Sequence, residues 1–523
     1  MEEHTWPKAD VNINNRGTIS SKIAKEQDAI AQGSTGLNDT EPQYADDEYE
    51  PHIIADRLAR KLSARQVQMI AIGGTIGTGL FLGTGKSLAT GGPASILIAY
   101  AIVGAIVFTT MLSLGEMAAY MPIAGSFCTF AGRFVDDAFG FALTWNYWFN
   151  DAVSTASDLV ALQLVLQYWT DNFPGWALSL IFWVVLIGAN IITVRAYGEV
   201  CNTSLTQLHS RANIKSGLGR VLVEPAESRD YHYGGTESIA ITAGETKNPA
   251  RNLPRVVKNV FWRILLFYIL SVLLIGLNVP YTYPNLSTKT TATSPFTIVF
   301  QQAGSKAAGS FINAVIMTSV LSAGNHALFA GTRLLYTLAV DGHAPMLFAK
   351  LNRHQVPWIA VLSTSIITGL CFGSSFIGAG TLWTWLQNIV GVSNQLAWIA
   401  IGITSLRFRS AIHMQGKSHL LPFRNWTYPV GPWLCVVFNI VIVLVQGWSC
   451  FSPKFDVASF FSYYIELPIM LVMYVVWKLV RGTKIVKLSE MDLDTDAYQD
   501  REEVFEKETG WKGHLTAAFR WLL

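Results

Sequence analysis

The sequence predicts an all-α integral membrane protein, and three observations support this fold class. Of the 523 residues, 51% are hydrophobic and 14% are charged, with a mean hydropathy of +0.32, whereas a soluble domain carries about 25% charged residues. About ten apolar stretches are long enough for the roughly 20-residue helix that crosses a bilayer. Two apolar stretches are interrupted by glycine, which is typical of transporters built from broken helices.

The apolar stretches define the expected spans in chain order. They cover approximately 66–88, 94–121, 139–169, 176–194, 260–279, 309–340, 358–377, 382–406, 432–451 and 460–480. Lysine and arginine concentrate beside alternate loops, so the positive-inside rule places both termini in the cytosol. Segment 195–232 contains no span. This orientation requires an even number of crossings there, and zero or two would satisfy it equally.

The pattern divides the chain into three regions. Residues 1–60 are polar and mixed in charge, so they are expected to form a disordered cytosolic tail. Residues 61–480 are expected to form the transmembrane domain, with 201–232 an anomalous polar segment inside it. Residues 481–523 are charged again and are expected to form a cytosolic C-terminal tail.

The first expected span contains an unusual run of glycine, Gly73–Gly79. Glycine in a helix interior costs roughly 1 kcal/mol relative to alanine, and lipid offers no partner to the backbone groups of a broken helix. A bound anionic group could be that partner at the start of the second half-helix. A substrate carboxylate is therefore expected at Thr75, Ile76, Gly77, Thr78 and Gly79. The alternative is close helix packing through small residues.

A second break repeats this order, because Gly234-Gly235-Thr236 echoes Gly73-Gly74-Thr75. Such a pair in corresponding halves of a chain points to inverted repeats. Glu237 follows directly, and an intramembrane carboxylate is costly enough to be a functional candidate. Glu237 is expected to stabilise the unwound region or to join a proton relay, with a polar lock between spans as the alternative. Glu116, near the inner end of the second span, is expected to serve in gating or in anchoring a loop.

Other polar side chains stand within the expected spans. Asp151 and Asp158 are seven residues apart and share a helix face, where hydrogen bonding inside the bundle is expected. Glu466, in the last span, is expected to serve packing or oligomer contact. The side chains expected around the substrate's own side chain are Trp383, Trp385, Asn388 and Asn394.

Several classes of protein are excluded by what the sequence lacks. The five cysteines are scattered without a C-x-x-C pair, so no disulfide framework, zinc site or thiol catalyst is expected. A net charge of +2 is too small to indicate a nucleic-acid partner. No P-loop, nucleophile elbow or metal-spaced ligand set occurs. An enzyme is therefore not expected, and neither is a cofactor or a metal.

Several motifs together resemble the fungal amino acid permease family of the amino acid–polyamine–organocation superfamily. The resemblance covers about 62–200 and 234–480. The motifs are Ile72–Phe81; Leu114-Gly115-Glu116-Met117-Ala118 with Pro122 and Gly125-Ser126-Phe127; Thr236-Glu237-Ser238 with Ala243-Gly244-Glu245; Gly331-Thr332-Arg333-Leu334-Leu335-Tyr336 with Gly342 and Ala344-Pro345; and Arg407-Phe408-Arg409.

The resemblance implies a twelve-span fold with five-plus-five inverted repeats. It also implies proton-coupled import of amino acids across the plasma membrane, so that an amino acid, a proton and the lipid bilayer are the partners. It places Tyr233, Gly234, Gly235 and Thr236 opposite the first break. Carbonyl oxygens left unpaired at the two breaks would there accept hydrogen bonds from the substrate ammonium.

The chain departs from the family pattern at one place. Members carry a fifth span after the Tyr197-Gly198-Glu199 motif and then a hydrophobic lead-in to the second break, but polar residues Cys201–His232 stand here instead. About ten spans are thus recognisable instead of twelve. A gene-model or splicing error is the leading hypothesis. The functions considered are a symporter, a non-transporting amino acid sensor on the same scaffold, and an inactive truncated product.

Overall fold

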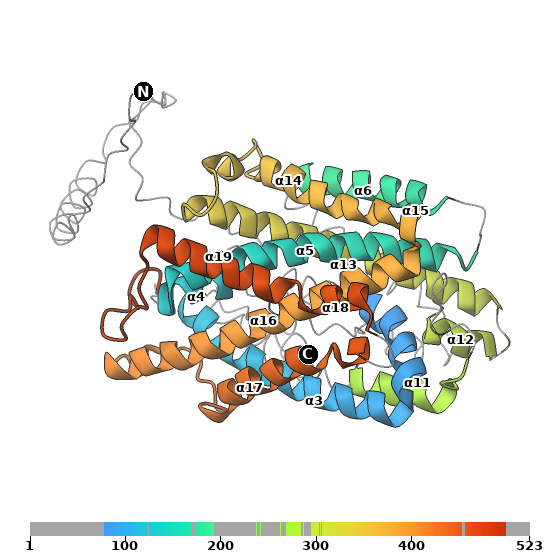
Figure 1. Ribbon diagram of the computed structural model, residues 1–523, viewed down its shortest axis with the longest axis horizontal. Helices are drawn as coiled ribbons and strands as arrows, with labels where there is room; N and C mark the ends of the chain where they lie inside the picture. Colours follow the sequence, from blue (N-terminus) through green and yellow to red (C-terminus); the bar gives the residue numbers. More distant parts are fainter. Residues whose placement is uncertain are drawn as a thin grey trace, which may run out of the picture. The chain divides into compact units, whose positions relative to one another are not determined.

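The computed structural model describes residues 78–123, 125–169, 174–192, 237, 241, 262, 268–283, 286, 294–302, 304, 306–451 and 455–497. The chain divides into two units, Met1–Ile54 and Ala55–Leu523, and every described residue belongs to the second. The tails expected at 1–60 and beyond 497, and the polar segment 201–232, lie outside the described residues. Every regular element in the described part is a helix (Figure 1).

The long helices follow the apolar stretches, and short helices connect them. Through the first half of the described chain the helices are η2 Gly79–Gly83, α3 Thr84–Tyr120, α4 Phe127–Phe134, α5 Asp137–Leu166, α6 Gly175–Ile192, α11 Leu270–Asn278 and α12 Pro295–Gln302. Through the second half they are α13 Lys306–Val340, η5 Met346–Ala349, α14 Trp358–Thr368, η6 Gly369–Gly373, α15 Ser374–Ile377, α16 Ala379–Met414, η7 Ser418–Leu420, α17 Val430–Val445, η8 Trp448–Phe451, α18 Val457–Tyr464 and α19 Glu466–Arg481.

The helical stretch from η2 to the end of α3 contains a break that separates two expected spans. Gly92 has φ 72° and ψ 171°, a conformation outside the helical region, and Pro93 follows it. Proline lacks the N–H that would continue the helix. The break thus falls between the spans expected at 66–88 and 94–121. The described part of the first span begins at Thr78 and enters the π-helix η2, whose wider turn is typical of functional positions in helices.

Helix α5 lies at the centre of the bundle and packs along α13 and α16 (Figure 1). Most of its side chains are buried, including polar ones. Its length matches the span expected at 139–169, yet it is not among the four helices that are long and apolar enough to cross a membrane by composition. Those are Gly79–Tyr120, Ala307–Val340, Trp358–Ile377 and Ala379–Met414, and the bent pair α18–α19 makes a fifth among the described residues. The polar residues of α5 explain the difference, because they face protein and not lipid.

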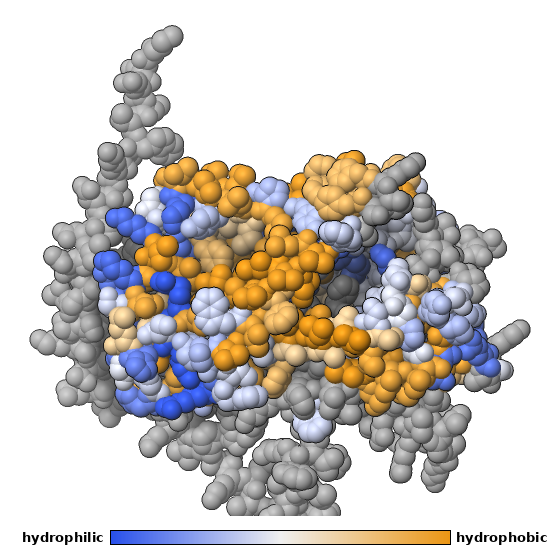
Figure 2. Space-filling view, turned by 60° about the horizontal axis from the view of Figure 1, so that its bottom comes forward, coloured by the Kyte–Doolittle hydropathy of each residue, from blue (hydrophilic) through white to orange (hydrophobic). Residues whose placement is uncertain are grey.

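The outward surfaces of the peripheral helices are apolar. Leu444 of α17 is 66% exposed and Leu479 of α19 is 77% exposed, and other apolar residues of both helices, such as Val445 and Val480, are exposed as well. Figure 2 shows apolar surface over the middle of one face, with hydrophilic residues gathered toward its two ends. An exposed apolar belt of this kind fits a lipid environment.

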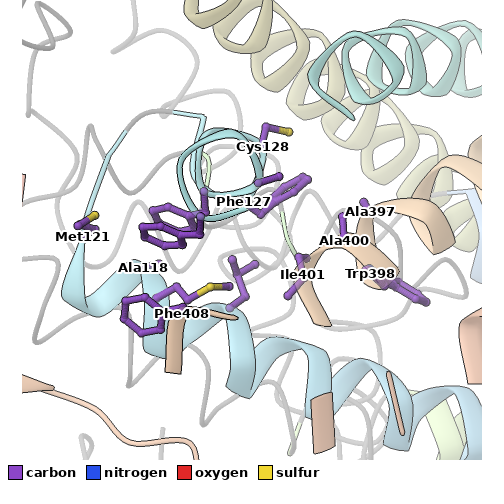
Figure 3. Packing of buried hydrophobic residues seen from close by; sticks show 14 of the residues in the cluster. Ala118, Met121, Phe127, Cys128, Ala397, Trp398, Ala400, Ile401 and Phe408 are labelled. Carbon is purple, nitrogen blue, oxygen red and sulfur yellow. The ribbon is translucent and has the colours of Figure 1, made fainter. Parts of the chain in front are cut away.

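A hydrophobic cluster closes one end of the bundle, which we call the α4 end because α4 lies there. Figure 3 shows Phe127 and Cys128 of α4 together with Ala118 of α3 and with Ile401 and Phe408 of α16. The aromatic rings contact one another edge-on or stacked: the Phe127 ring lies 4.9 Å from that of Tyr147, and the Phe134 ring 5.3 Å from that of Phe408.

A segment after the last helix folds back over the α4 end, and we call residues 483–497 the C-terminal strap. Helix α19 ends at Gly482, which has a left-handed φ of 62°, as is common at helix C-termini. The Val486 amide then donates to the Val135 carbonyl at 3.0 Å. Met491 and Leu493 of the strap are buried, so apolar contacts hold it as well.

Side chains from three helices reach backbone carbonyls of the strap. The Tyr120 hydroxyl at the end of α3 donates to the Leu493 carbonyl at 3.1 Å, and Arg407 of α16 donates to the Val486 carbonyl. Arg133 of α4 donates to the Thr495 carbonyl at 3.1 Å. The strap therefore joins α3, α4 and α16, which are separate in the chain.

Candidate functional site

The first glycine break is joined to the centre of the bundle by a buried hydrogen-bond cluster. Thr78, at the start of η2, donates from its hydroxyl to Asp158 Oδ1 of α5 at 3.1 Å. Gln387 of α16 donates from Nε2 to the Thr78 hydroxyl at 3.0 Å and to the Ser157 hydroxyl at 2.7 Å. Gly79 follows Thr78 and is buried, with no side chain between its backbone and the neighbouring helices. The break thus holds polar groups from α5 and α16 at one point.

Glu237, at the second break, is held by the same two helices. Its side chain is fully buried. The Tyr147 hydroxyl of α5 donates to Glu237 Oε1 at 2.5 Å, and the Trp398 indole of α16 donates to Oε2 at 3.1 Å. Both carboxyl oxygens therefore have a donor from a rigid helix, so the carboxyl group has a fixed orientation.

Further polar pairs connect α5 and α16 between these two points. The Asn150 side chain donates to Asn394 Oδ1 at 3.2 Å, and the Asn146 side chain donates to the Ser393 hydroxyl at 3.1 Å. We call this row of contacts, from Tyr147–Glu237–Trp398 to Thr78–Asp158–Gln387, the polar seam. It runs inside the bundle, where an unpaired polar group would be costly, and it links the two breaks through two helices.

Helix α13 supports α5 from another side through two glycines. A Cβ added at Gly331 would lie 3.0 Å from the Asp151 Cβ, and one added at Gly324 would lie 3.3 Å from the Asp158 Cβ. The Thr155 hydroxyl also donates to the Gly324 carbonyl at 3.3 Å. The two aspartates predicted to share a face thus both pack on α13, in antiparallel register, and small residues permit the close approach.

Most of the residues expected to bind substrate lie outside the described part of the chain. These are Thr75, Ile76, Gly77, Tyr233, Gly234, Gly235 and Thr236. Thr78, Gly79 and Glu237 are described and lie at the two ends of the polar seam. Their roles in binding stay predictions.

Glu116 lies away from the polar seam, at the α4 end. Arg409 of α16 forms an ion pair with its Oε1, and the Asn425 amide donates to the same oxygen at 3.1 Å. Asn425 belongs to the connection between α16 and α17, so Glu116 ties that connection to α3. Whether Glu116 serves in gating or in anchoring a loop stays a prediction.

The other expected side chains take different positions. Asn394 is in the polar seam, but Asn388 donates to the Ser462 hydroxyl of α18 at 3.0 Å. Asn325 of α13, which is not one of these expected side chains, accepts from the Asn190 side chain of α6 at 2.8 Å. Trp383 is buried, with its indole N–H unbonded in the described part of the chain.

The start of α5 is fixed to the end of α19 near the strap. Asp136 caps α5 by accepting from the Ala138 amide at 3.2 Å and forms an ion pair with Lys478. Burial alone would raise the pKa of Asp136, but the hydrogen bonds from Lys478 and from the Ala138 amide together hold that pKa below its ordinary value. The Trp477 indole donates to Asp137 at 2.9 Å. Helix α19 is therefore attached to α5 directly before the strap begins.

Sequence reasoning missed the partners of the predicted residues. Tyr147, Ser157, Gln387 and Trp398 were not singled out, although each bonds to Glu237, to Thr78 or to a neighbour of Thr78. A signal was present on α5, where Asn146, Asn150 and Ser157 recur at intervals of four and seven residues in an apolar stretch. That spacing places them on one helix face.

Among the described residues, an all-helical bundle with an apolar outer surface and a polar seam from Thr78 to Glu237 indicates a multi-pass membrane protein of the transporter class. The chain belongs to the amino acid permease family. The sequence profile described as "Amino acid permease" matches residues 66–205 and 231–490. This assignment supports amino acid transport, and the family name describes transporters and not enzymes.

Three relatives illustrate the match. A probable amino-acid permease of Schizosaccharomyces pombe is 45% identical over 493 residues, covering 84% of this chain and 96% of the relative. A lysine-specific permease of Escherichia coli is 40% identical, covering 84% and 96%. A lysine-specific permease of Saccharomyces cerevisiae is 35% identical, covering 93% and 84%.

The family match is interrupted where the sequence departs from the family pattern. Residues 206–230 fall between its two matched parts. The alignment to the S. pombe relative has 493 positions, but 84% of this chain is roughly 440 residues. The relative therefore has roughly 50 residues without a counterpart in this chain, about the length of two spans.

Proposed function

We propose that this protein imports amino acids across the plasma membrane by proton symport. The polar seam is the observation that carries the proposal, because it ties Thr78 and Glu237, which stand at the two predicted helix breaks, to the same pair of helices, α5 and α16. Transporters with inverted repeats bind substrate at such breaks near the middle of the bilayer. The proposal includes five-plus-five inverted repeats, with α18 and α19 outside them.

The two breaks would bind the two ends of an amino acid. The substrate carboxylate would accept hydrogen bonds from backbone N–H groups at Thr75–Gly79, where the second half of the first span begins. The ammonium would donate to carbonyl oxygens of both breaks, including those at Tyr233–Thr236. The position of Thr78 supports this arrangement, since its hydroxyl is held by hydrogen bonds to Asp158 and from Gln387.

A cationic amino acid is the proposed substrate class. Relatives from a bacterium and a yeast are both named lysine-specific permeases. In this chain Asp151 and Asp158 are buried around the polar seam, and among the described contacts neither of them has an ion pair with a cation. Buried carboxyl groups of this kind favour a substrate that brings positive charge.

The orientation and the coupling complete the proposal. The α4 end would face the cytosol, because Arg133, Arg407, Arg409 and Lys417 lie there and the positive-inside rule favours that side. Glu237 would couple proton movement to substrate transport, since a carboxyl group inside the membrane can change between a charged and a neutral form by releasing or binding a proton.

The test is uptake of radiolabelled L-lysine by a yeast host that lacks its own amino acid permeases. The protein is expressed from its spliced message. Uptake is expected to exceed the empty host, to increase as the medium is acidified and to fall when a protonophore is added. Arginine and histidine should compete more strongly than leucine or glutamate. Binding without accumulation would instead be the behaviour of a sensor.

A matched pair of variants tests the position of the site. Thr78→Val keeps the shape of the side chain but leaves Asp158 and Gln387 without their shared hydroxyl, which costs about 1–3 kcal/mol when polar groups are buried. Lysine affinity is expected to fall by roughly tenfold. Thr90→Val, on an exposed part of the same helix, should leave affinity unchanged. Equal effects of the two changes would argue against a site at Thr78.

A further inference from the structure

Glu466 lies at a bend in the last span, outside the proposed repeats. It is the first residue of α19, and α18 meets α19 there at an angle of 42°. Pro468 follows two residues later and lacks the N–H that would bond to the Tyr464 carbonyl in an unbroken helix. The bend therefore has a local cause in the sequence, and it places the Glu466 side chain at the joint.

The Glu466 carboxyl group points into the bundle and not toward lipid or another molecule. Its residue is only 4% exposed. The Ser393 hydroxyl of α16 donates to Glu466 Oε2 at 2.6 Å, and the same hydroxyl accepts from the Asn146 side chain of α5 at 3.1 Å. Glu466 Oε1 has no hydrogen-bond partner in the described structure. The contact with Ser393 extends the polar seam to α19.

No positive side chain in the described structure offsets a charge on Glu466. The helices around it are α5, α16 and α18. Residues 379–406 of α16 carry no charged side chain, and α18 contributes only Tyr463 and Tyr464 as titratable groups. The titratable groups of α5 are Asp137, Tyr147, Asp151 and Asp158.

The basic residues of α19 itself are far from the bend. Lys478 is twelve residues along the helix, roughly 18 Å at 1.5 Å per residue, and it is paired with Asp136. An ionised Glu466 would thus be a buried anion among neutral or acidic groups, which is costly in a membrane. In this position the protonated, neutral carboxyl group is favoured, and ionising it costs free energy.

We propose that Glu466 binds and releases a proton during each transport cycle and that Ser393 passes this change to α5. The inference rests on the proposed proton symport. A hydronium ion from the outer water gives its proton to a Glu466 oxygen and becomes water, and the proton later passes to water on the cytosolic side. Glu466 does not touch the substrate, so it is a positioning residue and not part of the binding site.

The proton on Glu466 is linked to α5 because the Ser393 hydroxyl group can donate only one hydrogen bond at a time. When Glu466 is ionised, Ser393 must donate to it, as the structure has it. When Glu466 is protonated, its O–H can donate to Ser393 Oγ, so the Ser393 hydrogen is free to turn to another acceptor, such as a carbonyl of its own helix. The proton on Glu466 thus changes which bonds Ser393 makes, one bond away from Asn146 and next to the Asn394–Asn150 pair.

A purely packing role makes a different prediction, so the two roles can be separated. Glutamine has nearly the same shape and hydrogen-bonding capacity as a protonated carboxyl group but cannot exchange a proton. A packing role would be kept by Glu466→Gln at every pH. A proton-binding role would be lost in that variant and partly kept in Glu466→Asp.

The first test uses the purified full chain in proteoliposomes with radiolabelled L-lysine. Under an inward pH gradient, Glu466→Gln is expected to accumulate lysine at least about 100-fold more slowly than wild type, the lower end of the range for a lost proton-transfer group. Lysine–lysine exchange without a gradient should continue, and the pH dependence of uptake should flatten. Glu466→Asp should keep part of the pH response. Ser393→Ala should also flatten it, while Ser462→Ala, in the same joint, should behave as wild type.

The second test needs no substrate and therefore separates this inference from the proposed function. Thermal unfolding of wild type and Glu466→Gln is measured between about pH 5 and pH 8.5. Because ionising the buried Glu466 carboxyl group is costly in the folded protein, wild type loses stability progressively as the pH rises, so the stability advantage of Glu466→Gln should grow with pH. The Ser462→Ala curve should run parallel to that of wild type.

Two results would overturn the inference. One is accumulation by Glu466→Gln with the wild-type pH profile, and the other is a constant stability difference between Glu466→Gln and wild type across the pH range. If wild type neither accumulates nor exchanges lysine, the proposed function fails, and the unfolding curves alone then decide whether Glu466 titrates.

Discussion

At the scale of single residues, Glu237 depends on two donors that come from distant parts of the chain. Tyr147 bonds to one carboxyl oxygen and Trp398 to the other, across sequence separations of 90 and 161 residues. Each donor also belongs to a helix that reaches the first break. A substrate or proton that changes the state of Glu237 therefore acts on α5 and α16 together.

Tyr147→Phe removes one of these donors without changing the packing of the ring. Glu237 then keeps its burial but loses a hydrogen bond, at a cost of about 1–3 kcal/mol. We expect lysine uptake to fall by roughly tenfold or more, with the amount of protein at the cell surface unchanged. Uptake kinetics and surface labelling measure the two quantities.

Tyr474→Phe is the matched control. Its hydroxyl donates to Asp136 at 3.4 Å and accepts from Lys478 at 3.1 Å, and both contacts lie at the α4 end, away from the polar seam. Uptake should stay at the wild-type rate. A Tyr147→Phe variant that also transported normally would show that the orientation of Glu237 does not depend on this bond.

The residues that sequence analysis could and could not find differ in a physical way. Thr78 and Gly79 could be proposed as site residues because glycine weakens a helix locally, whatever surrounds it. Glu237 was found because a carboxyl group in an apolar segment is costly wherever it faces. Gln387 bonds to Thr78 across 309 residues. Nothing local distinguishes it from another polar residue, since the contact exists only after α16 packs on α5.

At the scale of elements, α13 determines how closely α5 can approach. Gly324 and Gly331 lie against Asp158 and Asp151. These two small residues of an apolar helix therefore form the surface on which α5 packs. The long apolar helices were predictable from hydropathy and length. The pairing of α5 with α13 was not predictable, because the hydrophobic pattern of a helix does not indicate which other helix it packs against.

Gly324→Ala tests this contact. The added methyl group would lie 3.3 Å from Asp158 Cβ and 3.7 Å from Oδ2, so Asp158 or α13 must shift by a few tenths of an ångström. We expect a loss of about 1–3 kcal/mol in unfolding free energy, as in other overpacked interiors, together with reduced uptake. Thermal unfolding in detergent measures the first effect.

Gly188→Ala in α6 provides the comparison. No heavy atom lies within 4 Å of the added carbon there, and alanine is a better helix former than glycine. The melting temperature should stay equal or increase slightly. A similar loss in both variants would mean that glycine matters for flexibility and not for the α5–α13 contact.

The C-terminal strap is the element that the sequence did not predict, because residues 481–523 were expected to be a cytosolic tail. Its first part instead packs on the bundle through buried Met491 and Leu493. Leu493→Asp would place an unpaired charge among apolar side chains. We expect a lower melting temperature and faster proteolysis of the chain after α19, measured on the purified protein.

Ile485→Asp tests whether the position or the substitution matters. Ile485 is in the same strap but is 59% exposed, so a charge there stays in water. Its melting temperature should match that of wild type. If both variants were equally stable, the strap would contribute nothing to the folded state.

At the scale of the whole molecule, the interrupted family match predicts a longer natural chain. The match omits 206–230, and zero or two crossings in this region satisfy the orientation of the flanking spans. We expect the spliced message to encode about twenty more apolar residues there, the length of one span, together with a hydrophobic lead-in to Gly234. Transcript sequencing across codons 195–235 gives the answer. An abundant message that matches the present sequence would contradict the expectation.

The buried polar face of α5 has a consequence for biosynthesis. Asn146 and Asn150 bond to residues of α16 that are 247 and 244 positions later in the chain. At roughly 5–20 residues per second, the ribosome needs roughly 12–50 s to complete that distance. During this interval α5 has a polar face without its final partners and too little apolar character to be stable alone in lipid. We therefore expect helix α5 to stay in contact with the insertion machinery, and not to move freely into lipid, until α13 and α16 have entered the membrane.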